Sequence, residues 1–373
     1  MTQPSAPRWQ HYVLLQGERL RAFWVDHLSQ RERNLLFVLG RGFDPRMCMG
    51  LQLILEMGGS GQRDVLALDF REGPASPSLV YQDLVEANWT ALQGLFQGRG
   101  QITTRPLEFW SVEGRRASSQ NARDLFMSSH CFAGYTDVVV DVSAMPRSVF
   151  FPLLARILNL LDVARAVPVP TANLHVLVAD NPPLDAAIQE EGIDQMAEFM
   201  ASFMGGFDVE ATQTPKVWIP LLGEHRTTQF DRIRDLVKPD EVCPVLPSPA
   251  RNPRRGDNIV VEYQRVLFDE LRLNPAEFLY ASEQNPFEVY RQLRGAVVRY
   301  EEVFRLLGGC RVALSAMSSK LMSLGALLVA YELKQLEYNV GVAHIECQGY
   351  TMPAVVPTAE LFGLWVAGEC DGS

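Results

Sequence analysis

Short apolar runs alternate with longer helical patterns along most of the chain. The runs are rich in Val, Leu and Ile, they end at Gly, Pro, Asp or Ser, and stretches with helical spacing follow them. Strands that are apolar along their whole length are typical of parallel sheets with helices on both faces. The pattern therefore predicts an α/β fold built from βα units.

Ten such strands are expected, in two series of five that have similar spacing. The first series covers residues 35–40, 64–70, 106–110, 137–142 and 173–179, and the second covers 217–222, 241–246, 277–281, 310–314 and 340–345. A helix-like run over 18–31 precedes the first series, and the apolar run 361–368 is interpreted as an added edge strand. We expect two tandem Rossmann-like halves, each a mainly parallel sheet of about five strands flanked by helices.

One pair of segments indicates that the two halves arose by internal duplication. VVVDVSAMPRSVFFPLLARIL begins at Val138, and RVALSAMSSKLMSLGALLVAYEL begins at Arg311. Each contains a strand, Ser-Ala-Met, a basic residue and a long apolar helix, at the fourth strand of its series. The alternative is one large doubly wound sheet with recurring turns. The Gly- and Thr-rich stretch 205–215 predicts a boundary, with an N-terminal half over 1–208 and a C-terminal half over 209–373.

Composition narrows the functional classes. A chain of 373 residues is long enough for about two domains. Its net charge of −10 argues against a broad nucleic-acid-binding or membrane-binding surface, which needs a positive field. The six cysteines lack the paired spacing of a disulfide framework or a zinc ribbon. Because the apolar stretches are also too short to cross a bilayer, we expect a cytoplasmic protein.

Arginines concentrate in the loops that follow the expected strands. In open parallel sheets, ligands bind beyond the carboxyl ends of the strands, and guanidinium groups match phosphate or carboxylate oxygens. We therefore expect a local anion site, although ordinary polar loops would look similar. The candidate ligand-binding arginines are Arg41, Arg46, Arg147, Arg254 and Arg255. Carboxylates at or just beyond the strand ends could do acid–base work in hydrolysis, but we expect them to pair with the arginines and hold them in position. They are Asp44, Asp69, Asp141, Asp180, Glu224 and Glu283.

The strongest local signal is the segment LSAMSSKLMSLG over residues 314–325. Ser318 and Ser319 lie where a strand ends and an apolar helix begins, which leaves backbone N–H groups free to bind an anion beside Lys320. The segment predicts an anion-binding turn. The alternative is that the serines only cap the helix and that Lys320 points into water.

This turn also resembles a known family. SAMSSKLMSLGALLVA, from Ser315, is similar to the Lys-Met turn and following helix of CARF domains, the CRISPR-associated Rossmann-fold sensors of antiviral proteins. In that family the turn lies against a cyclic oligoadenylate. The resemblance covers 16 residues, and Met317 and Ser318 replace the family's usual glycine pair. It implies ligand-binding roles for Ser318, Ser319 and Lys320 and, if the halves are duplicated, for Ser143 and Arg147 at the pseudo-symmetric place.

The resulting hypothesis is a CARF-like sensor of a phosphate-bearing, nucleotide-type ligand, with a cyclic oligonucleotide as the candidate and an effector protein chain as partner. Two alternatives stay open: a stand-alone phosphodiesterase that cleaves the ligand, as ring nucleases do, and a non-catalytic subunit of a larger assembly. No cofactor or metal is expected, since the sequence contains neither a dinucleotide or Walker motif nor a His/Cys cluster. His175 and His344 are interpreted as core residues.

Overall fold

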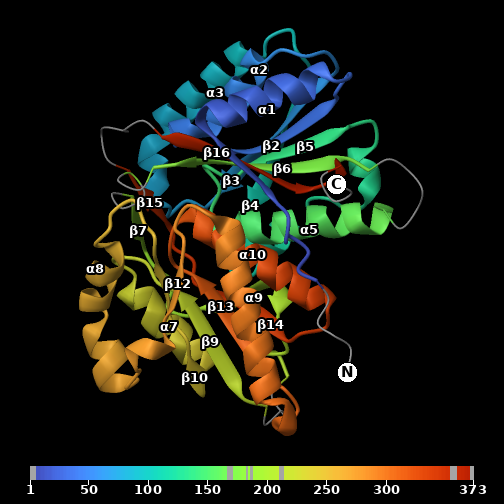
Figure 1. The fold of residues 1–373 in the computed structure, drawn as a ribbon. Helices are drawn as coiled ribbons and strands as arrows, with labels where there is room; N and C mark the ends of the chain where they lie inside the picture. Colours follow the sequence, from blue (N-terminus) through green and yellow to red (C-terminus); the bar gives the residue numbers. More distant parts are fainter. Residues whose placement is uncertain are drawn as a thin grey trace. The chain divides into compact units, whose positions relative to one another are not determined.

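The computed structural model describes residues 6–165, 171–181, 184, 188–209, 214–352 and 359–369. They form two compact units, each made from separate stretches of the chain. One unit comprises Tyr12–Glu191 and Gln348–Ser373, and the other comprises Met1–His11 and Gly192–Cys347. We call them the β2 unit and the β9 unit, after a central strand of each sheet. Each contains a mainly parallel sheet flanked by helices, which confirms the expected α/β class (Figure 1).

The β2 unit has a seven-stranded sheet in the order β1-β16-β6-β5-β2-β3-β4. The strands are β1 (Val13–Gln16), β2 (Leu35–Arg41), β3 (Arg63–Arg71), β4 (Ile102–Glu108), β5 (Asp137–Asp141), β6 (Asn173–Asp180) and β16 (Glu360–Ala367). The helices are α1 (Gly17–Ser29), α2 (Met49–Glu56), α3 (Gln82–Phe96), α4 (Ser118–Arg123) and α5 (Arg147–Arg165). Helices α1, α2 and α3 cover one face of the sheet, and α5 covers the other (Figure 1). A separate two-stranded ladder joins β7 (Gln189–Glu191) to β15 (Gly349–Thr351).

The β9 unit has a second sheet in the order β12-β11-β9-β13-β14-β8, with β10 also paired to β9. Its strands are β8 (Glu198–Met204), β9 (Lys216–Leu221), β10 (Glu241–Val242), β11 (Val245–Pro247), β12 (Leu279–Ala281), β13 (Arg311–Ala316) and β14 (Val340–His344). Its helices are α7 (Thr227–Val237), α8 (Arg255–Glu262), α9 (Pro286–Val303) and α10 (Lys320–Gln335). Trp218, Phe230 and Tyr263 belong to the core between the sheet and α7 and α8, whereas α9 and α10 pack together on the other face.

The two sheets share one strand order. If the five parallel strands of each series are numbered along the chain, both sheets have the order 3-2-1-4-5. In both, an antiparallel strand pairs with the fifth: β16 with β6, and β8 with β14. A duplication would produce this agreement, but unrelated doubly wound sheets can also share a strand order. The internal duplication therefore stays a prediction.

The division into units differs from the boundary expected at 208/209. The chain passes between the units at Glu191/Gly192 and at Cys347/Gln348, and residues 6–11 belong to the β9 unit. Sheet pairing explains the difference. Strand β8 precedes the expected boundary yet pairs with β14, and β16 returns to pair with β6.

Individual strands also depart from the expectation in three places. The C-terminal run forms β16 but lies inside the sheet, since β1 covers its outer side. Strand β4 begins at Ile102 rather than near 106, and it tolerates Pro106 because it is an edge strand. The expected strand 241–246 is interrupted at Cys243 and Pro244, which separate β10 from β11.

Candidate functional site

The switch point of the β9 unit lies between the neighbouring parallel strands β9 and β13. From their carboxyl ends the chain turns to α7 on one face and to α10 on the other, and open α/β sheets bind ligands at this kind of position. The two turns are packed closely. A Cβ atom added to Gly223, after β9, would lie 2.2 Å from the main-chain oxygen of Met317, after β13. Only glycine fits there, so the turn after β13 is held against the end of β9.

The turn after β13 has the local structure that its sequence predicts. Ser319 is the N-cap of α10, and its hydroxyl oxygen accepts a hydrogen bond from the Met322 main-chain N–H at 3.2 Å. Ser318 is buried, and its hydroxyl donates to the Met322 thioether sulfur at 3.2 Å. Lys320 is the first residue of the helix and is half-buried. Helix capping is therefore confirmed, whereas anion binding by the turn stays a prediction.

A buried glutamate joins this turn to the neighbouring loop. The Glu283 side chain, which follows β12, forms a close ion pair with the Arg255 guanidinium group, and its Oε2 accepts from the Arg251 main-chain N–H at 3.1 Å. The Glu283 main-chain oxygen accepts from the Ser319 hydroxyl at 3.3 Å. Arg255 also lies 3.6 Å from a Glu224 carboxylate oxygen. Three loops at one edge of the sheet are thus connected through one residue.

The two candidate arginines of this loop have different surroundings. Arg255 is the first residue of α8, and its side chain is 16% exposed because the two carboxylates cover it. Arg254 is exposed at the N-cap of the same helix, and its main-chain N–H donates to the Asn252 side chain at 3.1 Å. Glu283 therefore connects Arg255 to Ser319, the residue before Lys320, and Arg254 is exposed next to Arg255 in the chain.

The candidate arginines of the β2 unit pair with carboxylates, as the sequence predicted for Asp44. The Arg46 guanidinium is buried and donates to both Asp44 oxygens, to Oδ1 at 3.1 Å and to Oδ2 at 2.7 Å. Arg41 donates to Glu86 at 2.7 Å and lies over the Trp89 ring, with 4.8 Å between the guanidinium carbon and the ring centroid. Both guanidinium groups are therefore neutralised within the unit.

Ser143 and Arg147 also have local partners. The buried Ser143 hydroxyl accepts from the Ala179 main-chain N–H at 2.8 Å, and Arg46 donates to the Ala179 oxygen at 3.3 Å. Ser143 and Arg46 thus bind the main-chain N–H and the main-chain oxygen of the same residue, Ala179, at the end of β6. Arg147 begins α5 and lies 3.9 Å from a Glu190 oxygen. Ser315, which the sequence aligns with Ser143, instead accepts from the indole N–H of Trp218.

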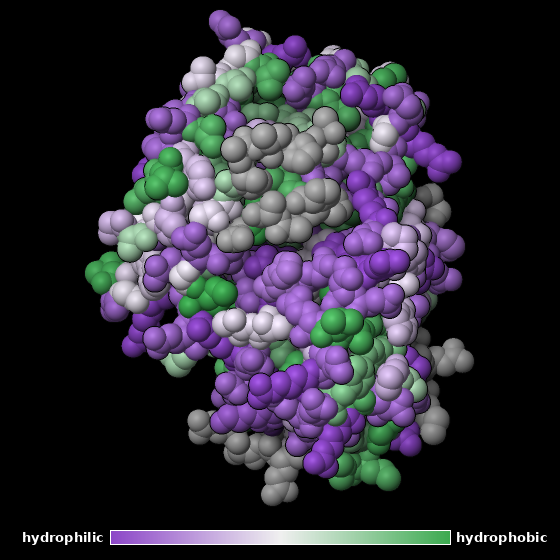
Figure 2. Space-filling view, turned by 90° about the vertical axis from the view of Figure 1, so that its left-hand side faces the viewer, coloured by the Kyte–Doolittle hydropathy of each residue, from purple (hydrophilic) through white to green (hydrophobic). Residues whose placement is uncertain are grey.

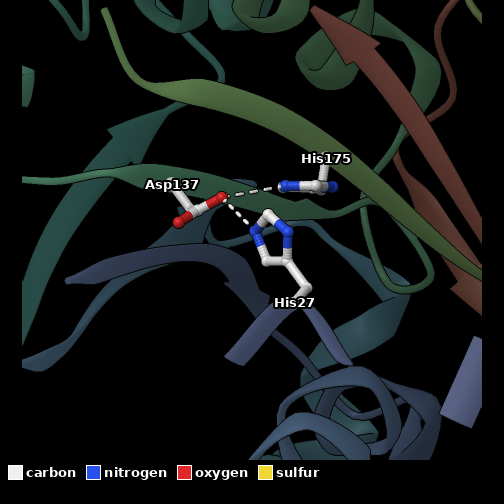
Figure 3. Close-up of side chains that lie close together, drawn as sticks. All are labelled: His27, Asp137 and His175. Carbon is white, nitrogen blue, oxygen red and sulfur yellow. Dashed lines mark hydrogen bonds and ion pairs between the residues drawn. The ribbon is translucent and has the colours of Figure 1, made fainter. Parts of the chain in front are cut away.

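The structure also assembles a buried cluster that the sequence does not reveal. His27 of α1, Asp137 at the start of β5 and His175 of β6 place three potential metal-ligand atoms within 4.8 Å of one another (Figure 3). Both Nε2 atoms approach one Asp137 oxygen, at 2.8 Å from His27 and 3.1 Å from His175. The three residues are too far apart in the sequence for spacing to suggest a site. His175 is buried, as its interpretation as a core residue requires.

The cluster matches a structural role better than a metal centre. Two imidazoles and one carboxylate are a common zinc ligand set. Here, however, Asn173 and Thr136 also donate to the Asp137 carboxylate, at 3.0 and 2.7 Å, and the buried Arg33 guanidinium lies 3.8 Å away. A cation would have to displace donors beside a fixed positive charge. We interpret the cluster as a hydrogen-bonded tie between α1 and the amino ends of β5 and β6.

The protonation of the cluster follows from these contacts. Burial by itself would raise the pKa of Asp137, but hydrogen bonds from His175 and His27 outweigh it and hold that pKa well below its usual value. Burial lowers the pKa of His175 from its usual 6.5, and this effect exceeds the opposing one of Asp137. The cluster therefore favours an ionised carboxylate beside a neutral His175.

The surface adds little that points to another site. The face drawn in Figure 2 is mostly hydrophilic, and its hydrophobic side chains form separate groups. Within the described part of the chain, every helix is too short or too polar to cross a bilayer. Cys48, Cys131, Cys243, Cys310 and Cys347 are free thiols.

Comparisons with known proteins give weak likenesses. No protein-family model matches the chain, and no curated protein sequence matches it. One similar solved structure is a type III CRISPR defence DNA nuclease activated by cyclic oligoadenylate, with 10% identity and a TM-score of 0.44, over 79% of this chain and 63% of that chain. Another is an uncharacterised protein from Mycobacterium paratuberculosis, with 9% identity and a TM-score of 0.22, over 82% of this chain and 76% of that chain.

The chain thus spans less than two thirds of the nuclease chain. With both TM-scores below 0.5, neither likeness decides what this protein does. The function has to be inferred from the site itself.

Proposed function

We propose that the protein is a sensor that binds a phosphate-bearing, nucleotide-type ligand at the carboxyl edge of the β9-unit sheet and acts through a partner chain. The observation that carries the proposal is the turn after β13, where a capped helix begins at Lys320 beside the switch point. The N-terminus of a long helix offers N–H donors and a partial positive charge to an anion.

The charge distribution supports a local anion site. The chain carries a net charge of −10, so an anion needs a site where cations gather. Lys320 adjoins Ser319, which is bonded to Glu283, and Glu283 in turn pairs with Arg255. A lysine and a helix N-terminus suit a phosphate better than a neutral ligand, and the arginine of the adjoining loop, Arg255, is paired with two carboxylates.

The ligand class rests on the resemblance of residues 315–330 to the CARF turn. That resemblance makes a cyclic oligoadenylate the first candidate and antiviral defence the proposed setting. A nucleotide sensor needs little chemistry of its own, which fits a site whose carboxylates pair with arginines rather than with one another.

Native mass spectrometry of the purified protein, compared with its denatured mass, tests the proposal. A co-purifying nucleotide, or binding of an added cyclic oligoadenylate in a calorimetric titration, is the expected result. A ligand-free mass together with no binding of cyclic oligoadenylates of several ring sizes would contradict it. Recovery of the ligand as linear products would assign the phosphodiesterase activity instead, and stable co-purification of several protein chains without nucleotide would favour the assembly subunit.

A further inference from the structure

The Glu283 side chain occupies a central position among the loops of the proposed site. It is only 1% exposed, although it lies at a strand end where most loop residues reach solvent. Its carboxylate bonds to the β11–α8 loop through Arg255 and the Arg251 N–H, and its main chain bonds to the β13–α10 turn through Ser319. Glu283 is therefore held by the same loops that would contact a ligand.

The charges around Arg255 do not favour an approaching anion. Two carboxylates, of Glu283 and Glu224, face one guanidinium group. A buried carboxylate is costly without a cationic partner, which accounts for the close Glu283–Arg255 pair. A phosphate that approaches Arg255 would meet repulsion from both carboxylates unless one of them withdrew.

We propose that Glu283 is the internal counter-ion of the site and that an anionic ligand competes with it for Arg255. In the ligand-free protein Glu283 neutralises Arg255 and fastens the β11–α8 loop. When a phosphate binds Arg255, the Glu283 carboxylate is released from that pair. This inference rests on the proposed function and adds a regulatory step to it, since Glu283 sets the ligand concentration at which the site fills.

The geometry gives the exchange a structural consequence. The carboxylate that would leave Arg255 also accepts the Arg251 N–H, and the same residue accepts the Ser319 hydroxyl at its main-chain oxygen. Release of the carboxylate would loosen the Arg251 end of the loop while the main-chain bond to Ser319 can persist. Ligand binding would then change the β11–α8 loop more than the turn after β13.

Glu283→Gln is the direct test, because glutamine keeps the shape of the side chain and removes its charge. The matched control is Asp257→Asn, which removes the same charge from an exposed residue two positions after Arg255. Calorimetric titration of the full chain with cyclic tetraadenylate, and separately with inorganic phosphate at matched ionic strength, measures the affinities. We expect Glu283→Gln to bind roughly tenfold more tightly than the native protein, and Asp257→Asn to stay within about twofold.

The double variant Glu283→Gln/Arg255→Gln identifies the cause of that gain. If competition for Arg255 is the reason, Glu283→Gln should give no gain in affinity when Arg255 is already replaced by Gln. A gain that persists without Arg255, or an unchanged or weaker affinity of Glu283→Gln, would overturn the counter-ion role while leaving the proposed ligand intact. A ligand-free mass of the native protein, together with no binding of cyclic oligoadenylates of several ring sizes, would overturn the proposed function and this inference with it.

Hydrogen exchange of the native protein tests the same step without a substitution, should Glu283→Gln fail to fold. We expect cyclic tetraadenylate to speed exchange of the Arg251 amide, whose acceptor is the Glu283 carboxylate. Slower exchange of that amide in the bound state would contradict the release of Glu283.

Discussion

The hydroxyl group of Ser319 donates a hydrogen bond to the main-chain oxygen of Glu283 at 3.3 Å, across 36 positions of the sequence. The same hydroxyl oxygen accepts the Met322 N–H and so caps α10. One side chain therefore serves both a local motif and a tertiary contact. The turn after β13 depends on both.

Replacing Ser319 by Ala should lower the free energy of unfolding by about 1 kcal/mol, the usual cost of losing an N-cap. Urea unfolding followed by circular dichroism measures the change. Ser29→Ala is the control, since the Ser29 hydroxyl donates to the main-chain oxygen of Asp26 at an exposed helix end. An equal loss of unfolding free energy in both variants would show that the Ser319 cap stabilises the protein no more than the exposed Ser29 hydroxyl does.

Replacing Lys320 by Ala should weaken binding of an anionic ligand by about 1.5 to 3 kcal/mol, as expected for a charge-assisted hydrogen bond, and leave the fold intact. Calorimetric titration with a cyclic oligoadenylate measures it. Lys334→Ala removes the same charge from the last turn of the same helix and should leave affinity nearly unchanged. Unaltered affinity of the Lys320 variant would mean that the turn only caps the helix.

Replacing Asp44 by Ala should cost about 3 kcal/mol or more of stability, because the buried Arg46 guanidinium would lose its partner carboxylate. Asp124→Ala is the control, since the Arg123–Asp124 pair is largely exposed and should contribute at most about 1 kcal/mol. Chemical unfolding of both variants measures the two losses of unfolding free energy. A small loss for Asp44→Ala would show that Arg46 reaches water or another acceptor.

Stability should fall as the pH drops below about 6.5, because His175 must take up a proton on unfolding. Its pKa is lowered in the folded protein, so its contribution is fully present above 6.5 and is lost as the pH falls toward the folded-state pKa. Asp137 stays ionised through this range, since its folded-state pKa is held far lower.

His175→Gln separates this effect from other titrations, because the glutamine amide can still donate to Asp137 but does not titrate. Denaturant unfolding at several pH values between about 5 and 7.5 gives the free energy of unfolding as a function of pH. The slope of that function should be smaller for the variant than for the native protein. Identical slopes would show that His175 does not contribute to the acid sensitivity.

The apolar pattern of the sequence by itself determined the α/β class and the approximate places of the ten main strands. Strand β13 and the cap at Ser319 were predictable from a few adjacent residues, because strand burial and helix capping are short-range properties. The pairing of Asp44 with Arg46 was predictable for the same reason, since only two positions separate them. Strand β1, with four residues, was too short to be recognised.

Tertiary structure alone decided which distant side chains meet. His27 reaches Asp137 across 110 positions only because α1 packs beside the start of β5, and β16 enters the sheet only because β1 and β6 lie on either side of it. The pairing of Glu283 with Arg255 likewise depends on the adjacency of β11 and β12. Such contacts follow from strand order, which long-range pairing sets and which no local stretch of sequence encodes.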